Sequence, residues 1–362
     1  MTINAFMLEP IKKLSQHYQV HIIFNGNAEE MSPELEIAGL IPVRIERKIS
    51  PWQDLLALLR LIKIFRSHNF EIVQSVTPKA GLLAMMASFF AGVKIRSHIF
   101  TGQIWVTRRG MNRWVFKQVD RLIAMLATDV LVDSVSQRQF LLDENVVSAS
   151  RSVVLAKGSI AGVDIERFKP DVQLRAKVRQ ELEYDADNTV FLFIGRLNRD
   201  KGVLDLATAF ARINESRARL LIVGPDEAGM QAQMERILAN CVNRVHFVGY
   251  SAHPEIYMAA ADVLCLPSYR EGFGSVVLEA AAVGIPAIGS RIYGVEDSIV
   301  DGQTGLLFSA GNIEELQHCL QAIIDDGEMA SRFGETARTR VAQEFSSEIL
   351  ASAWLDYYQA NL

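Results

Sequence analysis

Two glutamates stand eight residues apart in EGFGSVVLEAAAVGIP, a run that is otherwise apolar and rich in glycine. Residues 275–283 have helical spacing, and Gly284 and Pro286 are typical of the end of a helix. Glu271 is therefore expected in a strand-to-helix loop, and Glu279 one turn inside the helix. Both carboxylates could then point into a cleft at the carboxyl end of the preceding strand.

Two cations flank a second strand-to-helix turn. Arg196 and Lys201 belong to FLFIGRLNRDKG, which runs into a helical stretch from Val203. The first amides of a helix lack partners and its dipole favours anions, so such a turn attracts phosphate. A guanidinium fork beside an ammonium suits a diphosphate. A solvated basic turn is the alternative interpretation of this segment alone.

Together the two turns predict one crevice in which cations and carboxylates meet a single ligand. A carboxylate accepts two hydrogen bonds from a vicinal diol, so one glutamate suits a ribose and the other a hexose. Charge-assisted hydrogen bonds contribute about 1.5–3 kcal/mol each, so a few suffice for micromolar binding. The alternatives are that Glu279 only meets the helix dipole and that Glu271 is an exposed loop acid.

Length and composition indicate two globular domains. The chain has 362 residues, 49% of them hydrophobic, which is enough for two cores. Its three cysteines have neither pairing nor metal spacing and indicate reduced, buried thiols in a cytosolic protein. No basic stretch followed by an apolar run opens the chain, so no cleaved signal is expected. The longest apolar run, 80–93, is shorter than the ~20 residues of a transmembrane helix.

The net charge of −5 is unevenly distributed along the chain. Residues 1–170 carry 21 Lys and Arg against 15 Asp and Glu, and the remainder carries 16 against 27. The acidic total argues against general nucleic-acid binding, which relies on many cations that neutralise phosphates. A basic half on an acidic protein indicates that one face meets an anionic partner.

Short β-rich runs alternate with helical stretches in both halves, which predicts an α/β fold with parallel sheets covered by helices. The expected strands are 21–24, 41–45, 72–76, 95–100, 130–133, 153–155, 190–194, 220–223, 245–248, 263–266, 287–289 and 306–308. We expect a first domain at residues 1–165 plus a helix at about 346–362, and a second at 170–345. The hinge between them contains GSIAGVD and FKP.

The first domain opens unusually. Residues 4–14 have a helical pattern, and the first strand candidate begins only at His21. A doubly wound domain normally starts with a strand that becomes central in its sheet. That strand either lies upstream of Met1 or is not part of the sheet, and we favour an upstream segment.

The motifs of the second half resemble the retaining family 4 glycosyltransferases. They are Gly195-Arg196 with Lys201-Gly202, Val223-Gly224-Pro225, Val248-Gly249-Tyr250, Pro267-Ser268 with the E-x7-E segment, Gly284-Ile285-Pro286, and Asp301-Gly302 with Thr304 to Leu307. The resemblance covers nearly the whole second half and extends to GVDIERFKP and FSSEILASAWLDYY. The first half matches more loosely and is most similar to bacterial polysaccharide and O-antigen members, around SVTPKAGLLA and SHIFTGQIW.

This resemblance implies a GT-B fold of two facing Rossmann-like domains, with the donor bound mainly in the second and the last helix crossing back onto the first. Arg196 and Lys201 would hold the leaving diphosphate, and Glu271 would position the transferred sugar. The other donor-binding groups implied are Gly224, Tyr250, the backbone of Phe273 and Gly274, the amides of Ser275 and Val276, and Glu279 on the ribose. Transfer would retain the anomeric configuration by attack on the face that the diphosphate leaves, through an oxocarbenium-like state, and the enzyme would mainly stabilise the leaving charge electrostatically. No cofactor or metal is expected, and Asp185-Ala-Asp187 is interpreted as turn chemistry.

The first half departs from the family on the acceptor side. Many members carry a histidine where this chain has Thr101. His98 lies three residues earlier and is more simply a core histidine. Thr101, Gly102 and Gln103 thus remain candidates for contact with donor sugar or acceptor. The glycine loop that follows the usual first strand is also absent, which bears on diphosphate contacts from this domain.

Residues 102–121 mix aromatic and cationic side chains, including Trp105, Trp114, Arg108 and Arg109. This combination suits the interface of an anionic bilayer or an acceptor that carries a lipid diphosphate. The alternative is a solvated basic helix with buried tryptophans. The helical run 52–65 is expected to pack in the ordinary way, and 80–93 to lie buried against the sheet.

We therefore predict a retaining glycosyltransferase that moves a hexose or N-acetylhexosamine from a nucleotide sugar, with UDP favoured by family frequency. The expected acceptor is a lipid-linked glycan at the cytoplasmic membrane face, in surface polysaccharide or O-antigen synthesis. One alternative is a sugar-nucleotide epimerase on the same fold, which would need acid/base groups in both halves. Another is a non-catalytic nucleotide- or glycan-binding subunit. No G-x-G-x-x-G follows an expected strand, which disfavours an NAD enzyme.

Overall fold

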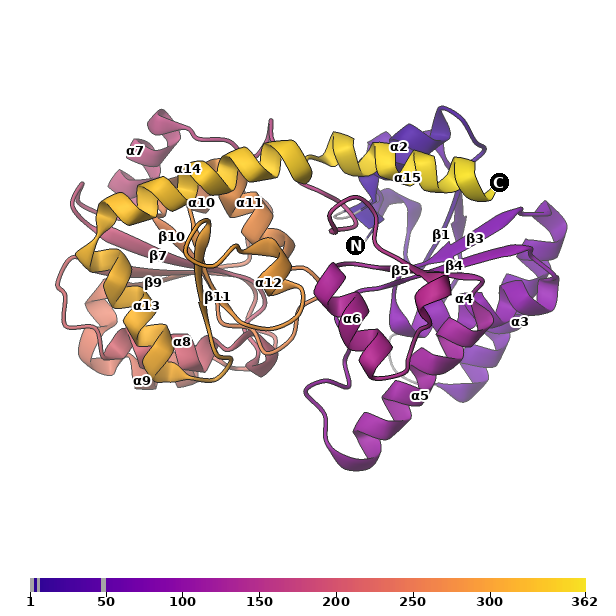
Figure 1. Ribbon diagram of the computed structural model, residues 1–362, viewed down its shortest axis with the longest axis horizontal. Helices are drawn as coiled ribbons and strands as arrows, with labels where there is room; N and C mark the ends of the chain where they lie inside the picture. Colours follow the sequence, from indigo (N-terminus) through magenta and orange to yellow (C-terminus); the bar gives the residue numbers. More distant parts are fainter. Residues whose placement is uncertain (1–2, 5–6, 47–49) are drawn as a thin grey trace. The chain divides into compact units, whose positions relative to one another are not determined.

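The computed structural model describes residues 3–4, 7–46 and 50–362. The chain divides into two compact units (Figure 1): the first takes in the chain up to Gly162 together with Ser347–Leu362, and the second is Val163–Ser346. Every strand ladder among the described residues is parallel. Both units are therefore α/β structures in which helices connect successive strands.

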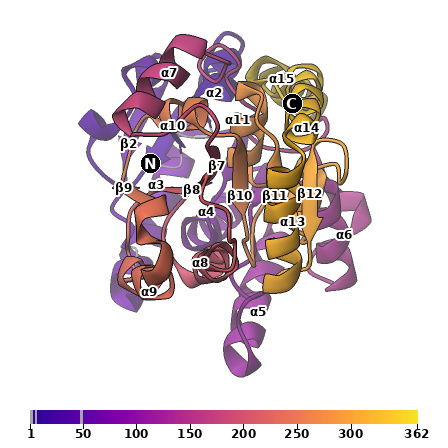
Figure 2. The ribbon, with the colours of Figure 1, turned by 90° about the vertical axis from the view of Figure 1, so that its left-hand side faces the viewer.

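A six-stranded sheet in the order β12-β11-β10-β7-β8-β9 forms the centre of the second unit (Figure 2). Its strands are β7 (Thr189–Ile194), β8 (Ala218–Val223), β9 (Val245–Gly249), β10 (Val263–Leu266), β11 (Ala287–Ser290) and β12 (Gly305–Phe308). Its helices are α7 (Val172–Glu181), α8 (Val203–Ala211), α9 (Gln231–Ile237), α10 (Pro254–Ala260), α11 (Ser275–Val283), α12 (Val295–Ser298), α13 (Ile313–Asp325) and α14 (Gly327–Glu344).

The strands of this sheet are nearly continuous apolar runs because helices cover both faces. In β7, Phe191 and Phe193 enter one hydrophobic core, and Val190 and Leu192 enter another. The alternation follows from the two-residue period of a strand. The sheet therefore separates two apolar layers and leaves its carboxyl edge to the loops.

The first unit contains a four-stranded sheet in the order β3-β4-β5-β6 and a separate pair, β1-β2. The strands are β1 (His21–Phe24), β2 (Gly39–Pro42), β3 (Ile72–Ser75), β4 (Ile95–Phe100), β5 (Asp129–Val132) and β6 (Ser152–Val153). The helices are α2 (Leu8–Ser15), α3 (Pro51–His68), α4 (Pro78–Ala91), α5 (Gly110–Leu126), α6 (Val135–Asp143) and α15 (Ser347–Asn361).

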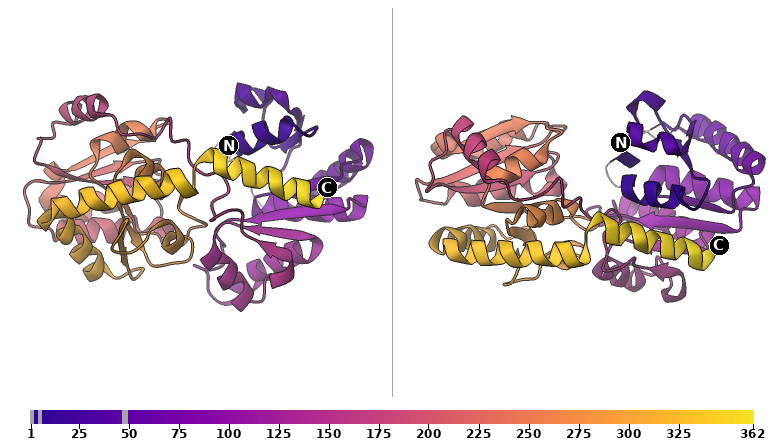
Figure 3. Two further views of the ribbon diagram at one scale, coloured as in Figure 1. Left: turned by 45° about the horizontal axis from the view of Figure 1, so that its top comes forward. Right: turned by 90° about the horizontal axis from the view of Figure 1, so that it is seen from above.

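The last helix of the chain belongs to this first unit. α15 packs against α2, as Figure 3 shows, and buries Trp354 completely. The indole Nε1 of Trp354 donates a hydrogen bond to the carbonyl oxygen of Ile160 at 2.9 Å. The two ends of the chain therefore share one core, which also takes in Met7, Ile11 and Tyr357.

All of the expected strands occur, with shifts of up to three residues at their ends. The strand expected at 41–45 is β2, which begins at Gly39 and ends at Pro42, and the one expected at 153–155 is only the two-residue β6. The helical pattern of 4–14 appears as α2, and residues 5–6 of that pattern lie outside the described residues. In the first unit the sheet is interrupted, because β1 and β3 are not paired with each other in the described chain.

The prediction that the helix at residues 52–65 packs its apolar side chains in the ordinary way is wrong for one side of α3. Only the stripe Ala57, Leu61 and Phe65 is buried, at a spacing of four residues. Leu58, Ile62 and Ile64 are half-buried against the same core. Four large apolar residues lie on the other side of the helix and are exposed: Trp52 by 68%, Leu55 by 44%, Leu56 by 45% and Leu59 by 55%. Helix α4 is mostly buried, as expected, but it exposes Phe89 and Phe90 at its end.

Gly334 provides a test of how α14 packs on the end of α11. A Cβ at Gly334 would stand 2.1 Å from the carbonyl oxygen of Gly284. We expect Gly334→Ala to lower the free energy of unfolding by about 1–3 kcal/mol, although alanine has the higher helix propensity. Gly327→Ala, at the first position of the same helix with no described atom within 4 Å, is the control and should be neutral or mildly stabilising. Equal urea midpoints for the two variants would contradict this packing.

Candidate active site

The loops that follow β7, β8, β9 and β10 meet at the carboxyl edge of the six-stranded sheet. Backbone hydrogen bonds join them: Leu197 N to Pro225 O at 2.9 Å, Gly224 N to Gly249 O at 2.7 Å, and Tyr269 N to Asp200 O at 2.8 Å. The carboxyl edge of an open parallel sheet is where α/β proteins bind ligands. The predicted donor-binding residues all lie on these loops or on α11, which follows β10.

Close backbone contacts hold these loops together. A Cβ at Gly202 would lie 1.9 Å from the carbonyl oxygen of Pro267, and one at Gly224 would lie 1.8 Å from that of Gly195. Gly202 also has a positive φ of 65°, which disfavours any other residue. Neighbouring loops can therefore approach each other only because glycine stands at both positions.

The first of these contacts brings Lys201 to Glu271. The Lys201 ammonium lies 2.5 Å from Oε1 of Glu271, and Ser268 Oγ donates to the same oxygen at 2.7 Å. The side chains are 22% and 13% exposed, so water only partly screens the pair. Within the described residues, Oε2 of Glu271 has no partner and is free to accept from a ligand.

The turn that carries Lys201 is locally specified. Asn198 precedes the 3-10 turn Arg199–Lys201, and its side-chain oxygen accepts a hydrogen bond from the Lys201 amide at 3.1 Å. This is the capping role that asparagine fills at helix starts. Arg196, on the same loop, is 47% exposed and lies 3.4 Å from Glu227. Such an exposed pair is weak, so the guanidinium can turn to another anion.

Glu279 lies on α11 with its carboxyl group largely withdrawn from water. Burial raises the pKa of Glu279 to about 7; the Arg167 guanidinium opposes this shift and the Glu255 carboxylate adds to it. No hydrogen bond or ion pair of this carboxyl group occurs in the described part of the chain. Glu279 itself is half-buried, and an acid without a partner has unused capacity to accept hydrogen bonds from a ligand.

The first turn of α11 offers its backbone rather than its side chains. Phe273 is 1% exposed, and its ring packs 5.4 Å from that of Phe345 in the core. Gly274 caps the helix, and the amides of Ser275 and Val276 are among the first of the helix, where no preceding turn supplies an acceptor. Tyr250, which follows β9, is 74% exposed.

Two contacts at this edge were not predictable from the local sequence. Arg167, in the hinge segment, donates to Glu255 Oε2 at 2.8 Å, and both residues influence Glu279. Tyr269 donates to Asp205 at 2.6 Å and so ties the loop after β10 to α8. The arginine of GVDIERFKP was visible in the sequence, but nothing local indicated that it would meet a helix about ninety positions later.

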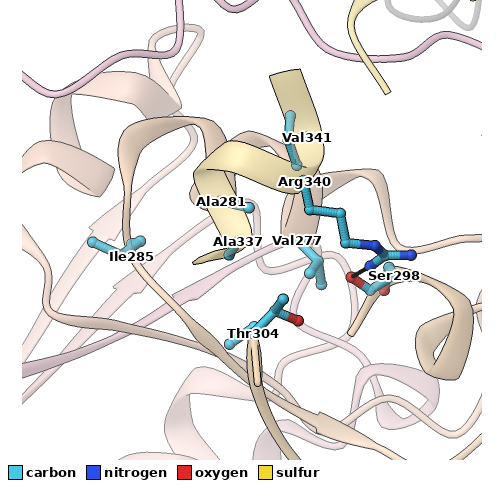
Figure 4. A pocket seen from close by; sticks show the side chains of 9 residues that line it. Val277, Ala281, Ile285, Ser298, Thr304, Ala337, Arg340 and Val341 are labelled. Carbon is cyan, nitrogen blue, oxygen red and sulfur yellow. Dashed lines mark hydrogen bonds between the residues drawn. The ribbon is translucent and has the colours of Figure 1, made fainter. Parts of the chain in front are cut away.

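Two other features do not contribute to this site. Asp185 and Asp187 bond with Asn188 in the turn before β7, in agreement with their interpretation as turn residues. The cavity in Figure 4, between α11 and α14, measures about 10 Å³ and is crossed by Arg340, which donates to Ser298 O at 3.0 Å. It can hold about one water at most and is too small for a sugar. No cluster of metal-binding side chains occurs among the residues that the structure describes.

In the first unit, His98 is enclosed in the core. It is 1% exposed, and its Nδ1 lies 2.7 Å from Ser75 Oγ. Burial lowers the pKa of His98 to about 3, so the ring is neutral. A Cβ at Gly81 would lie 2.4 Å from the imidazole, so a helix covers it closely. This position favours the core-histidine interpretation over contact with a substrate.

Thr101 and Gln103 form part of a buried polar network after β4. The carbonyl oxygen of Thr101 accepts from the side chains of both Gln103 and Gln137 at 2.7 Å. Gln137 also donates to Gln103 at 3.0 Å. Because Gln103 is only 2% exposed, its amide holds this loop in shape, and the half-buried Thr101 and Gly102 are the accessible part of the loop.

The stretch 102–121 divides into a buried and an exposed part. Trp105 is fully buried, donates to Asp120 at 2.7 Å and lies beneath Arg113, whose guanidinium is 5.0 Å from the ring centre. Arg113 and Lys117 are both paired with Glu144. Trp114 is 59% exposed, and Arg108 and Arg109 are exposed as well. The alternative interpretation, a solvated basic helix with buried tryptophans, therefore agrees with Trp105 but not with Trp114.

Comparison with known proteins relates both units to enzymes that transfer sugars. Residues 175–340 match the family described as "Glycosyl transferases group 1", and residues 3–158 match the "Glycosyl transferase 4-like domain". The capsular polysaccharide biosynthesis glycosyltransferase CapM of Staphylococcus aureus is 30% identical over 339 residues, which cover 92% of this chain and 88% of the relative. The UDP-Gal:alpha-D-GlcNAc-diphosphoundecaprenol alpha-1,3-galactosyltransferase of Escherichia coli is 25% identical over 306 residues, which cover 83% of this chain and 78% of the relative.

Solved structures agree on the fold. The structure of Anabaena HepE in complex with UDP-glucose superposes with a TM-score of 0.81 at 20% identity, covering 98% of this chain and 94% of the other. The fold is GT-B, with two Rossmann-like domains, as the motif resemblance implied.

The raised pKa of Glu279 predicts that the stability of the protein depends on pH. An acid whose pKa is raised on folding binds its proton more tightly in the native state than in the unfolded state. The stability that this bound proton contributes to the fold is therefore present at pH 4–5 and is lost as the pH rises through about 7. Glu279→Gln should therefore gain stability relative to the wild type between pH 5 and pH 8, by on the order of 1–3 kcal/mol. Thermal unfolding across this range measures the difference. The exposed control Glu314→Gln should differ from wild type by a constant amount, and a constant difference for Glu279→Gln would refute the assignment.

Proposed function

This chain belongs to the group 1 glycosyl transferases, and from that premise we propose that it moves a hexose or N-acetylhexosamine from a UDP-sugar to a lipid-diphosphate-linked glycan in surface polysaccharide synthesis. The paired Lys201 and Glu271 at the carboxyl edge of the sheet carry this proposal. The names of the relatives support it, since one serves capsular polysaccharide synthesis and another acts on a diphosphoundecaprenol-linked sugar. The UDP-glucose in the Anabaena structure supports a UDP-sugar as donor.

The donor would bind with its diphosphate between the loop after β7 and the start of α11. Arg196 and Lys201 supply two positive charges, and the amides of Ser275 and Val276 supply hydrogen bonds at a helix N-terminus. Glu271 accepts from hydroxyls of the transferred sugar through its free Oε2, and Glu279 accepts from the ribose. The backbone near Gly249 and Tyr250 would hold the base, and Gly224 would also contact the donor.

Transfer would proceed by loss of the diphosphate from the anomeric carbon. The bonding electrons pass to the phosphate oxygen, whose growing charge is met by Lys201, Arg196 and the helix amides already in place. The acceptor hydroxyl attacks from the face that the diphosphate leaves, which retains the configuration, and the departing phosphate oxygen is the nearest base for its proton. We propose no metal in this step, because the two cations and the helix amides meet the charge.

The lipid-linked acceptor would bring the protein to a membrane surface. No helix within 3–4, 7–46 and 50–362 combines the length and apolar character needed to cross a bilayer. We define the α3 surface as Trp52, Leu55, Leu56 and Leu59 with Arg60 and Lys63, all exposed. Apolar side chains beside cations on one helix face suit the interface of an anionic membrane. Trp114 and Arg109 repeat the combination at α5.

Lys201→Ala and Glu271→Ala are expected to lower kcat at least about 100-fold, because each removes a group that would meet the diphosphate or the transferred sugar. Far-ultraviolet circular dichroism should show that both variants remain folded. Arg199→Ala changes an exposed cation on the same turn and should retain activity. The assay screens nucleotide sugars against lipid-diphosphate acceptors with mass spectrometry of the products. Near-wild-type rates for both variants would refute the site.

The same assay separates the alternatives. A glycosyltransferase releases UDP only when acceptor is present, whereas an epimerase converts the donor without it. Calorimetric binding of UDP-sugar without turnover on any acceptor would favour a non-catalytic subunit.

The α3 surface predicts binding to anionic vesicles. Leu56→Ser together with Leu59→Ser should reduce co-sedimentation with phosphatidylglycerol vesicles at least about tenfold, because two inserted leucines are lost. Val172→Ser together with Val242→Ser removes two apolar side chains that are 81% and 57% exposed in the second unit and serves as the control. Equal effects of the two double variants would contradict a role for the α3 surface.

A further inference from the structure

The carboxylate of Glu271 is bonded through one of its two oxygens. Its Oε1 accepts from the Lys201 ammonium at 2.5 Å and from Ser268 Oγ at 2.7 Å, whereas no group in the described chain donates to its Oε2. The Glu271 side chain is only 13% exposed. Because water does not fully screen a carboxylate in this position, its negative charge acts on any group that a ligand brings beside it.

Lys201 would contact both this carboxylate and the diphosphate of a bound ligand. An ammonium has three N–H donors, and Glu271 uses one of those of Lys201. A phosphate oxygen that accepts from another donor would lie about 2.8 Å from Nζ. The distance from that phosphate oxygen to Glu271 Oε1 therefore cannot exceed the two bonds placed end to end, which is about 5 Å.

The other cations on these loops are also matched by acids. Arg270, which precedes Glu271 in the chain, lies 3.2 Å from Asp200. Arg196 lies 3.4 Å from Glu227. The positive charge of both guanidinium groups is therefore partly neutralised before a ligand arrives, so it only partly offsets the charge of the Glu271 carboxylate.

The donor and the product of the proposed reaction differ in charge at this point. In a UDP-sugar the outer phosphate is esterified by the sugar and carries one negative charge. In free UDP the same phosphate is terminal and carries about 1.5–2 negative charges near neutral pH. The donor also has sugar hydroxyls that can donate to Glu271 Oε2, and UDP has none at this place. The carboxylate therefore gains a bond from the donor and meets an additional like charge in the product.

We infer that Glu271 makes the site select the intact donor over the free diphosphate that transfer leaves behind, a role that rests on the proposed function. While the sugar is bound, its hydroxyls satisfy the carboxylate. Once the sugar has passed to the acceptor, the outer phosphate loses the acceptor's proton to water and becomes a terminal anion. Repulsion between this anion and Glu271 lowers the affinity for the product and speeds its release.

Lys201 can respond to the product in two ways, and both disfavour it. If the ammonium stays between the two anions, they remain within about 5 Å of each other and repel. If the ammonium turns to the diphosphate alone, Glu271 loses its cation and keeps only the bond from Ser268. A largely buried carboxylate is costly to leave without its cation.

The test measures affinity rather than turnover, with the full chain and without divalent cations. Calorimetry at about pH 8 compares UMP, UDP and UDP-glucose on the wild type and on Glu271→Gln. The variant should bind UDP at least about fivefold more tightly than the wild type does. UMP lacks the outer phosphate, so its affinity should change less than about twofold. UDP-glucose should gain nothing, because it loses a charge-assisted hydrogen bond.

Glu227→Gln is the matched control, because it removes an acid that faces Arg196 on a neighbouring loop. It frees that guanidinium for the diphosphate of either ligand, so the affinities for UDP and UDP-glucose should change by the same factor. A measurement on the wild type covers the case in which Glu271→Gln does not fold. UDP β-methyl ester carries less charge on its outer phosphate than UDP and should bind the wild type at least about threefold more tightly.

The selection role is overturned if Glu271→Gln leaves the affinity for UDP unchanged or weakens it, or if UDP-glucose gains as much as UDP. It is also overturned if Glu227→Gln shifts the ratio of the two affinities to the same extent, or if the methyl ester binds the wild type no better than UDP. These results would leave the proposed function intact. Absence of binding of both UDP and UDP-glucose to the wild type would instead overturn the proposed function, and the selection role with it.

Discussion

The contact between Gly202 and the carbonyl oxygen of Pro267 is the constraint on which the candidate site depends. At this contact a Cβ would stand only 1.9 Å from the oxygen, so the turn after β7 and the loop after β10 touch through their backbones. Lys201 and Glu271 flank this contact, and their ion pair follows from it. Four loops are then linked at the sheet edge by main-chain hydrogen bonds, which places cations, carboxylates and helix amides together. Rigid backbone support of this kind preorganises charged groups for a ligand.

Glu279 shows that the residues of such a site can lower the stability of the folded protein. Its side chain is half-buried and has no partner in the described residues, and desolvation raises the pKa of its carboxyl group to about 7. A helix position in a purely structural protein would carry an apolar residue here, as the neighbours Leu278 and Ala280 do. Retaining an acid at this position lowers stability at neutral pH, and binding sites commonly hold such groups in exchange for affinity. Arg167 from the hinge segment partly offsets this cost.

The first unit differs from the second in how much of its apolar surface is covered. In the second unit, both faces of the sheet are closed by helices and the core strands are almost completely buried. In the first, α3 exposes four large apolar residues, and the sheet is divided between β1 and β3. Several buried polar side chains there are nevertheless satisfied, since His98 meets Ser75 and Gln103 meets Gln137, whereas Ser15 Oγ and His21 Nδ1 have no hydrogen-bond partner among the described residues. The open features are therefore local, and they adjoin a well-packed core.

Patterns between near neighbours were enough to predict the elements. The apolar run of β7, the glycine at the end of α11 and the asparagine turn before Lys201 depend on a few adjacent residues. The grouping of Glu271 with Lys201 was also foreseeable, because both follow parallel strands of one sheet. Other properties arose only when distant segments packed. They include the 1% exposure of His98, the exposed side of α3 and the effect of Arg167 on Glu279. Burial and electrostatic surroundings are set by atoms that are remote in the chain, and no local pattern records them.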